Sequence, residues 1–348
     1  MCKKITALMF CALFVILAGC KKNPATDNSS GAVSSAPSAV VSHPPKPVKD
    51  YNNLTGLYEL DKGKKNKRPV AIMINNIKFA QPIQTGINKA DIIYETEVEG
   101  GISRLMAVYK DISKVGQIGS VRSARYVYVD LALAHDAIYL HCGQDPTYCK
   151  PHLSAIDDVS IDTNNYCKRV PNGLAWEHTL YAFGDKIAKG LPSKFNCTTS
   201  KTSSWQNFAD KDEQVTLNGG VCNSLAVTFS SSYITKFSYN SESGVYTRLN
   251  NGSAQKDYCN GQTTNVKNVF ILLTSISYYP NKYRRYVALD SGNGYYVTNG
   301  TYTPIKWKKG GASSPLVFTN TDGSALKVNA GKSWVCISSK TEKAPAFQ

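Results

Sequence analysis

Two arginines, Arg122 and Arg125, stand three residues apart in the segment QIGSVRSAR, where an apolar run ends and a helix-like run begins. If Ser123 caps that helix, both arginines lie at its N-terminal end, where the helix dipole is unfavourable for a cation. Two kinds of partner would make the arrangement favourable. One is an internal carboxylate, Glu95 or Glu99, and the other is an anionic ligand such as a phosphate or pyrophosphate. The ion pair is the simpler interpretation because it requires no second molecule.

Three acidic residues alternate in the segment ETEVEGG: Glu95, Glu97 and Glu99. On a strand they would share one face, where three carboxylates repel one another unless water, a cation or arginine lies between them. A solvated strand face is the simpler interpretation, because antiparallel sheets commonly expose one side. The functional alternative is a site in which one carboxylate acts as acid or base and arginines hold an anion. These arginines would be Arg104, Arg122 and Arg125.

His141 is a further candidate acid or base, because it ends the apolar run AIYLH and is expected at the carboxyl end of a strand. Clefts in α/β sheets lie at such ends. The adjacent Cys142 would point to the opposite face, so no His–Cys dyad is predicted. The sequence has no GxSxG, HExxH, P-loop or dinucleotide motif, and no CxxC pair. We therefore expect no metal and no cofactor, and the motifs identify no reaction.

The elements that would position these residues are short strands and two helices. The runs RPVAIMINN, ADIIYETEV, SRLMAVYKD, VGQIGSV and AIYLHCG have the length and composition of strands. SARYVYVDLALAHD has apolar residues at helical spacing, and a second helix is predicted from His178 to a stop at Gly190. Strands and helices that mix in this way predict an α/β or α+β domain with a mixed sheet over residues 51–200.

Residues 201–348 have a different pattern. Helical periodicity is absent, and apolar runs such as LAVTF, NVFILLTSI and GYYVTNG alternate with Asn-Gly and Asp-Gly pairs. Such pairs between apolar runs are the strongest short-range signal for a β-hairpin. This region is therefore predicted to be a smaller, mostly antiparallel β domain, separated from the first by the polar stretch 198–204.

The N-terminus has the layout of an export signal. Residues 1–19 combine a short basic segment with an apolar stretch too short for a comfortable membrane span. They end in Leu-Ala-Gly before Cys20, which matches a bacterial lipobox and predicts cleavage there and acylation of the Cys20 thiol, for example with palmitate. Residues 20–50, rich in Ser, Ala, Pro and Val, predict a disordered tether. The expected location is the extracytoplasmic face of the cell membrane, held by the lipid.

The chain is basic, with a formal net charge of +15. Removal of Lys3 and Lys4 with the signal leaves 15 − 2, or about +13, which favours solubility and attraction to an anionic envelope. No nucleic-acid-binding motif is present, so nucleic acid is not an expected partner. Seven of the ten cysteines lie after Cys20. Because seven is odd, at least one is unpaired in a monomer.

Four segments together resemble a known family. RPVAIMINN, ADIIYETEVEGGISRLMAVY, IGSVRSARYVYVDLA and DAIYLHCG occur in this order behind a lipobox. In this they resemble the YerB-like bacterial lipoproteins, a two-domain family of unknown function, over most of residues 55–340. The resemblance implies an extracytoplasmic lipoprotein and assigns no catalytic residues.

Two functions follow as hypotheses. In the first, the protein is a non-enzymatic binding or regulatory module of the cell envelope, whose partner is a cell-wall polymer or a wall-synthesis protein. In the second, it is an enzyme acting on a phosphate-bearing envelope substrate, with the arginines binding the anion. The first is favoured because the sequence contains no nucleophile and base at a defined spacing.

Overall fold

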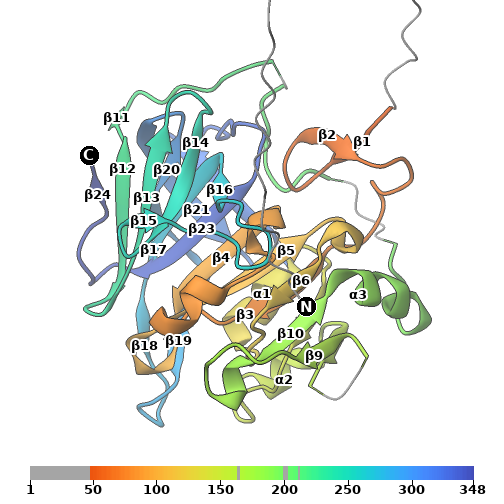
Figure 1. Ribbon diagram of the computed structural model, residues 1–348. Helices are drawn as coiled ribbons and strands as arrows, with labels where there is room; N and C mark the ends of the chain where they lie inside the picture. The colour runs from red at the N-terminus through yellow and green to blue at the C-terminus, as the bar shows by residue number, and fades with distance from the viewer. Residues whose placement is uncertain (1–47, 163–164, 199–202, 211) are drawn as a thin grey trace, which may run out of the picture. The chain divides into compact units, whose positions relative to one another are not determined.

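The computed structural model describes residues 48–162, 165–198, 203–210 and 212–348 (Figure 1). The predicted signal, the lipid-attachment residue Cys20 and the tether as far as residue 47 lie outside these ranges. Val48–Gln348 form one unit by their internal contacts. Within the described ranges, no helix is both long enough and apolar enough to span a membrane.

An eleven-stranded sheet contains strands from both predicted domains. In spatial order its strands are β11 (Gly220–Val221), β21 (Thr301–Lys309), β20 (Ser291–Thr298), β17 (Asn268–Thr274), β23 (Ser333–Ser339), β4 (Ile92–Glu97), β5 (Ser103–Tyr109), β3 (Val70–Ile74), β7 (Ile138–His141) and β8 (Asp158–Ser160), and β22 (Leu316–Asn320) pairs with β21.

The pairing directions confirm the predicted fold class. In the N-terminal region β4, β5 and β3 pair antiparallel, whereas β3, β7 and β8 pair parallel, so this part of the sheet is mixed. The C-terminal strands pair antiparallel except β23, which is parallel to both β17 and β4. Because β23 and β4 are neighbours, the two regions share one sheet. Whether they unfold separately stays a prediction.

A second, six-stranded sheet is entirely antiparallel and comes from the C-terminal region. Its strands are β15 (Ser253–Ala254), β14 (Val245–Asn250), β13 (Tyr233–Asn240), β12 (Ser224–Ser230), β24 (Ala346–Phe347) and β16 (Asn265–Val266). The Asn251-Gly252 pair turns β14 into β15, and Asn299-Gly300 turns β20 into β21. Both pairs have positive φ at both residues, 50° and 80° in the first and 49° and 72° in the second. The hairpins predicted from these pairs are confirmed.

The remaining elements are short. The small sheets contain β1 (Asp50–Asn52) with β2 (Leu57–Leu60), β6 (Gln117–Gly119) with β10 (Leu180–Phe183) and β9 (Cys167–Arg169), and β18 (Ile276–Tyr278) with β19 (Arg285–Val287). The helices are α1 (Tyr126–Leu133), α2 (Lys150–Leu153) and α3 (Gly184–Gly190). The 3-10 turns are η1 (Lys78–Ile83), η2 (Ile87–Lys89), η3 (Glu99–Gly101), η4 (Ile112–Lys114), η5 (Trp176–His178) and η6 (Leu191–Ser193).

The large sheet is buried on both faces. Side chains alternate along each strand, so Trp334 and Cys336 of β23 join one core, whereas Val335 and Ile337 join the other. The first core includes residues of the six-stranded sheet and α3, and the second includes residues of α1 and α2. The candidate site lies where β4 ends and α1 begins.

The structure corrects the predicted start of the first helix. Arg125, not Ser123, is the N-cap residue of α1, and no side chain caps it. The residues before it are held in an extended path, because the Arg122 amide donates to the Met73 carbonyl at 3.1 Å and the Ala124 amide to that of Gly143 at 2.9 Å. Because of this pairing with distant segments, the N-cap of the helix lies two residues later than predicted.

The predicted helix from His178 is also shorter than expected. Residues 180–183 form β10, which pairs with both β6 and β9, and only Gly184–Gly190 is helical. The apolar LYAF run is largely buried and pairs with a strand on each side. This tertiary pairing outweighs the local helical pattern.

Candidate functional site

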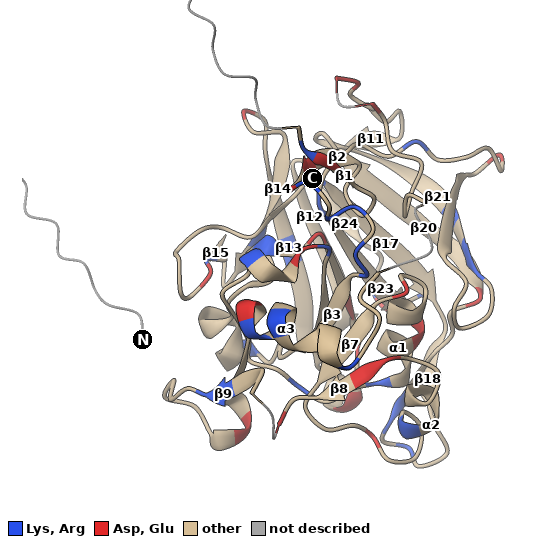
Figure 2. Cartoon of the chain, turned by 90° about the vertical axis from the view of Figure 1, so that its right-hand side faces the viewer, with Lys and Arg blue, Asp and Glu red and all other residues tan. Residues whose placement is uncertain are grey.

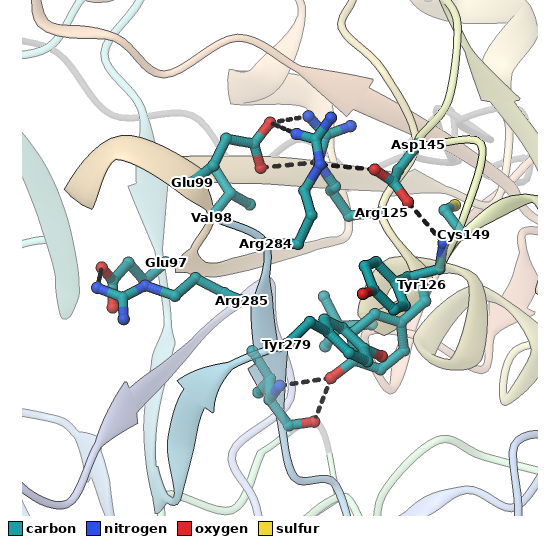
Figure 3. A pocket seen from close by; sticks show the side chains of 13 residues that line it. Glu97, Val98, Glu99, Arg125, Tyr126, Asp145, Cys149, Tyr279, Arg284 and Arg285 are labelled. Atoms are coloured by element: carbon teal, nitrogen blue, oxygen red, sulfur yellow. Dashed lines mark hydrogen bonds and ion pairs between the residues drawn. The ribbon is translucent and has the colours of Figure 1, made fainter. Parts of the chain in front are cut away.

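Glu99 lies among three arginine side chains at the start of α1. Figure 3 shows two of them, Arg125 and Arg284. Arg125 donates from Nε to Glu99 Oε2 at 2.9 Å and from Nη2 to Oε1, which is a two-point contact. Arg284 Nη1 lies 2.7 Å from Oε1, and Arg104 Nη2 lies 4.0 Å from the same oxygen. Glu99 is only 8% exposed, so the ion pairs are largely shielded from water.

Four separate segments bring these groups together, and one of them is β5, which contains Arg104. β4 ends at Glu97, and the turn that follows contains Gly100 and Gly101 with φ of 72° and 67°, a conformation that favours glycine. This turn places Glu99 beyond the strand end. Arg125 is the last extended residue before α1, and Arg284 comes from the turn of the β18–β19 hairpin.

The cluster carries one positive charge in excess. Arg284 Nε also lies 2.6 Å from Asp145 Oδ2, so three arginines face two carboxylates. Burial lowers the pKa of Arg104 and of Arg125 to about 10, which leaves both protonated at neutral pH. Burial acts to raise the pKa of Asp145, but the Tyr148 amide and Arg284 together hold it below its usual value. Arg104, Arg125 and Asp145 are therefore charged at neutral pH.

The space beside the cluster is small. The cavity lined by Glu99, Arg125, Asp145 and Arg284 has a volume of about 20 Å³, which is room for one water molecule. Figure 3 shows the Arg284 guanidinium lying between the two carboxylates. An anionic ligand could reach Arg125 only if the Arg284 side chain moved away.

The interpretation of Glu95, Glu97 and Glu99 as a solvated strand face is wrong, because all three are buried. Glu95 is fully buried and accepts hydrogen bonds from Asn76 (3.0 Å), Ser103 (2.7 Å), Thr235 (2.8 Å) and Trp334 (3.0 Å). Glu97 pairs with Arg285; burial raises its pKa and Arg285 opposes that shift. Each carboxylate thus has its own donors.

Arg122 does not join the cluster. It donates to the Glu177 carbonyl at 2.7 Å and lies 3.6 Å from the carboxylate of the same residue. In an extended segment, residues three apart point to opposite sides, so Arg122 and Arg125 diverge where a helix would have kept them together. Of the two predicted carboxylate partners, Glu99 pairs with Arg125 and Glu95 pairs with neither arginine.

His141 is buried, with both ring nitrogens engaged. Nδ1 lies 2.8 Å from the Gly143 carbonyl oxygen and Nε2 lies 2.9 Å from Asp158 Oδ2. Burial raises the pKa of the Cys149 thiol to about 12 and also raises that of Cys142, so neither is a thiolate at neutral pH. Among residues 48–162, 165–198, 203–210 and 212–348, no group of three potential metal ligands comes together.

The β18–β19 hairpin is the feature that sequence reasoning missed. Residues 278–286, YYPNKYRRY, contain four tyrosines, three basic residues and no acidic residue. Tyr278, Tyr283 and Tyr286 are 53%, 55% and 43% exposed. The Arg285 guanidinium lies 3.8 Å from the Tyr278 ring centroid, and that of Arg284 lies 4.9 Å from Tyr283. The high proportion of tyrosine and arginine in this segment is the sequence signal that could have identified the hairpin as a candidate site.

Comparisons with known proteins identify the family. The profile described as "Protein of unknown function (DUF3048) N-terminal domain" matches residues 54–198, and the corresponding C-terminal profile matches residues 225–335. The protein named "Putative lipoprotein YerB" from Bacillus subtilis (strain 168) is 26% identical over 349 residues, 96% of this chain and 95% of that protein. The crystal structure of YerB protein from Bacillus subtilis matches with a TM-score of 0.72 at 26% identity, over 83% of this chain and 96% of that one. The chain therefore belongs to the DUF3048 family, which confirms the resemblance to YerB-like proteins.

Proposed function

We propose that this protein is a lipid-anchored, extracytoplasmic module that binds an anionic polysaccharide of the cell wall and catalyses no reaction. The observation that carries the proposal is the β18–β19 hairpin, where exposed tyrosine rings lie against arginine side chains. The anchor is supported by the signal and lipobox that end at Cys20, and by the lipoprotein name of the Bacillus relative.

The chemistry of the hairpin suits a charged glycan. Tyrosine offers an apolar ring face and a hydroxyl, so it packs on the C–H face of a sugar and hydrogen-bonds its hydroxyl groups. Arginine presents a planar set of donors that matches phosphate and carboxylate geometry. The hairpin carries both, and its Arg284 also belongs to the Glu99 cluster, in which three arginines face two carboxylates.

Charge over the rest of the fold does not favour another anionic partner. In the view of Figure 2, basic and acidic positions are interspersed rather than gathered on one side. A binder of nucleic acid would present its lysines and arginines as one stripe or patch. The basic residues of the hairpin are distinguished by their tyrosine neighbours, which favours a sugar-containing polymer.

The anchor gives the first prediction. Replacing Cys20 with Ser should abolish acylation, because serine lacks the thiol that is modified. Metabolic labelling with an alkyne fatty acid, followed by fractionation, measures this directly. Continued labelling of the Cys20→Ser protein would show that the lipid is attached elsewhere or that the lipobox is not used.

The hairpin gives the second prediction. The triple variant Tyr278→Ser, Tyr283→Ser, Tyr286→Ser should bind purified cell-wall sacculi at least about tenfold more weakly, a loss of about 1.4 kcal/mol. A matched control is Tyr258→Ser, which removes a tyrosine that is 56% exposed elsewhere on the fold. Cosedimentation of the full chain with sacculi, before and after chemical removal of their anionic polymer, measures the affinity.

The same assay can contradict the proposal. Equal binding by the triple variant and the Tyr258→Ser control would remove the hairpin from the interaction. Binding that persists after the anionic polymer is stripped would show that the partner is the remaining peptidoglycan and not that polymer. Absence of binding to either preparation by the wild type would exclude the polymer as partner.

A further inference from the structure

A second cavity lies on the α1 face of the large sheet, away from the tyrosine hairpin. It has a volume of about 510 Å³, which is in the range of small-molecule sites. The end of α1, the segment 203–207 and β22 contribute to its lining. Its larger apolar lining residues include Leu54, Pro69, Trp205, Leu316, Phe318 and Leu326.

Lys110 also lines this cavity, and its ammonium group has no hydrogen-bond partner among the described residues. Lys110 directly follows β5, where its side chain continues the alternation of Met106 and Val108 towards the α1 core. The residue is only 2% exposed. Burial lowers the pKa of Lys110 to about 8, so the amine is still mostly protonated at neutral pH.

Asp91 and Asp136 attract the amine, but neither accepts a hydrogen bond from it. Burial lowers the pKa of His135 to about 3, so its ring is neutral, and its Nε2 lies 2.7 Å from the Tyr94 hydroxyl. Asp136 pairs with Arg68 at 3.3 Å. Asp91 attracts the amine but accepts its hydrogen bonds from Asn52 and the Lys110 amide.

Burying an ammonium group without a hydrogen-bond acceptor costs free energy. An anion that bound beside it would supply acceptor oxygens and form a favourable charge-assisted hydrogen bond. The apolar lining determines what else the anion must carry. Trp205 and Phe318 meet edge to face with centroids 6.1 Å apart, and they offer ring surface to an apolar body. The cavity therefore combines one cation with an aromatic wall.

We propose that this cavity binds a small carboxylate with an apolar body, whose carboxylate pairs with Lys110 and whose body packs against Trp205 and Phe318. This site is separate from the tyrosine hairpin, and it does not depend on the proposed binding of wall polymer. The ligand class is defined by one negative charge and an apolar chain or ring.

Displacement of a fluorescent probe from the full chain tests the site. Octanoate has the proposed charge and apolar body, and 1-octanol has the same chain without the charge. Octanoate should displace 8-anilinonaphthalene-1-sulfonate from the wild type with an affinity at least about tenfold higher than that of octanol. In Lys110→Met the octanoate affinity should fall to that of octanol, because the variant keeps an unbranched side chain of nearly the same length and loses its charge.

Two further variants make the result specific. Lys62→Met removes an exposed lysine and should leave both affinities unchanged. Ala325→Trp places a bulky ring at an exposed position of the cavity lining and should weaken both ligands. Equal octanoate affinity in the wild type and Lys110→Met, or tight binding by Ala325→Trp, would overturn the proposal. Equal affinity of the wild type for octanoate and octanol would overturn it without recourse to any variant.

Discussion

Replacing Glu99 with Gln is expected to lower the free energy of unfolding by roughly 3–5 kcal/mol, the usual cost of removing one partner of a buried ion pair. Glu99 is the carboxylate that Arg125 contacts at two points and that Arg284 and Arg104 also approach. Without it, Asp145 alone faces three largely buried guanidinium groups. For a folded region of this size the loss corresponds to a melting temperature lower by about 5–10 °C.

Glu177→Gln is the matched control, because it removes the carboxylate near Arg122. Glu177 is exposed and lies 3.6 Å from Arg122, so its replacement should cost less than about 1 kcal/mol. Differential scanning fluorimetry of the two variants at low and high salt measures both effects. If both variants had the melting temperature of the wild type, the ion pairs around Glu99 would not stabilise the fold. The alternative, that these arginines bind an anionic ligand, would then be favoured.

The comparison of Arg122 and Arg125 shows what the sequence could predict about the site. The unfavourable position of a cation before a helix correctly indicated a carboxylate partner for Arg125, and Glu99 was one of the two residues expected. The sequence could not show that Arg122 turns away. That outcome depends on backbone bonds to Met73 and Gly143, which hold residues 122–124 extended. Local propensity contains no information about such pairing.

Distance along the chain explains the other differences. The alternation in β4 correctly predicted the strand, but whether its acidic face is wet depends on what covers it. Thr235 and Trp334, far away in the sequence, supply two of the four donors to Glu95. In the same way Arg284 reaches Glu99 from the β18–β19 hairpin. The apolar runs predicted the strands because alternation is a local property of the sequence. The polar contacts could not be predicted because their partners are far apart in the sequence.

The polar contacts of Glu95 belong to a buried hydrogen-bond network, here called the joint, that connects the N-terminal and C-terminal regions. Arg248 of β14 is 2% exposed, and it donates to Asn76 Oδ1 at 2.9 Å, to Gln84 Oε1 at 3.1 Å and to Gln255. Burial lowers the pKa of Arg248, and the Glu95 carboxylate opposes that shift. Asn76 and Gln84 come from the N-terminal region, whereas Arg248 and Gln255 come from the C-terminal region. The joint therefore crosses the boundary between the two family profiles.

Arg248→Met should therefore destabilise both regions together. The variant leaves the Glu95 carboxylate buried without its cation and leaves the amide oxygens of Asn76 and Gln84 with one donor fewer, so we expect a loss of roughly 3–5 kcal/mol. Lys236→Met on the neighbouring strand β13 is the control; its side chain is exposed, and the change should stay within about 0.5 kcal/mol.

The shape of the unfolding transition then tests the division into domains. If β23 pairing with β4 and the Arg248 joint couple the two regions, scanning calorimetry should show a single transition that moves to lower temperature in Arg248→Met. Two transitions in the wild type, with only one of them shifted in the variant, would mean that the regions fold as separate domains in spite of their common sheet. A shift of less than about 1 °C would mean that the buried guanidinium is compensated locally, and that the continuity of the sheet rather than this charge holds the regions together.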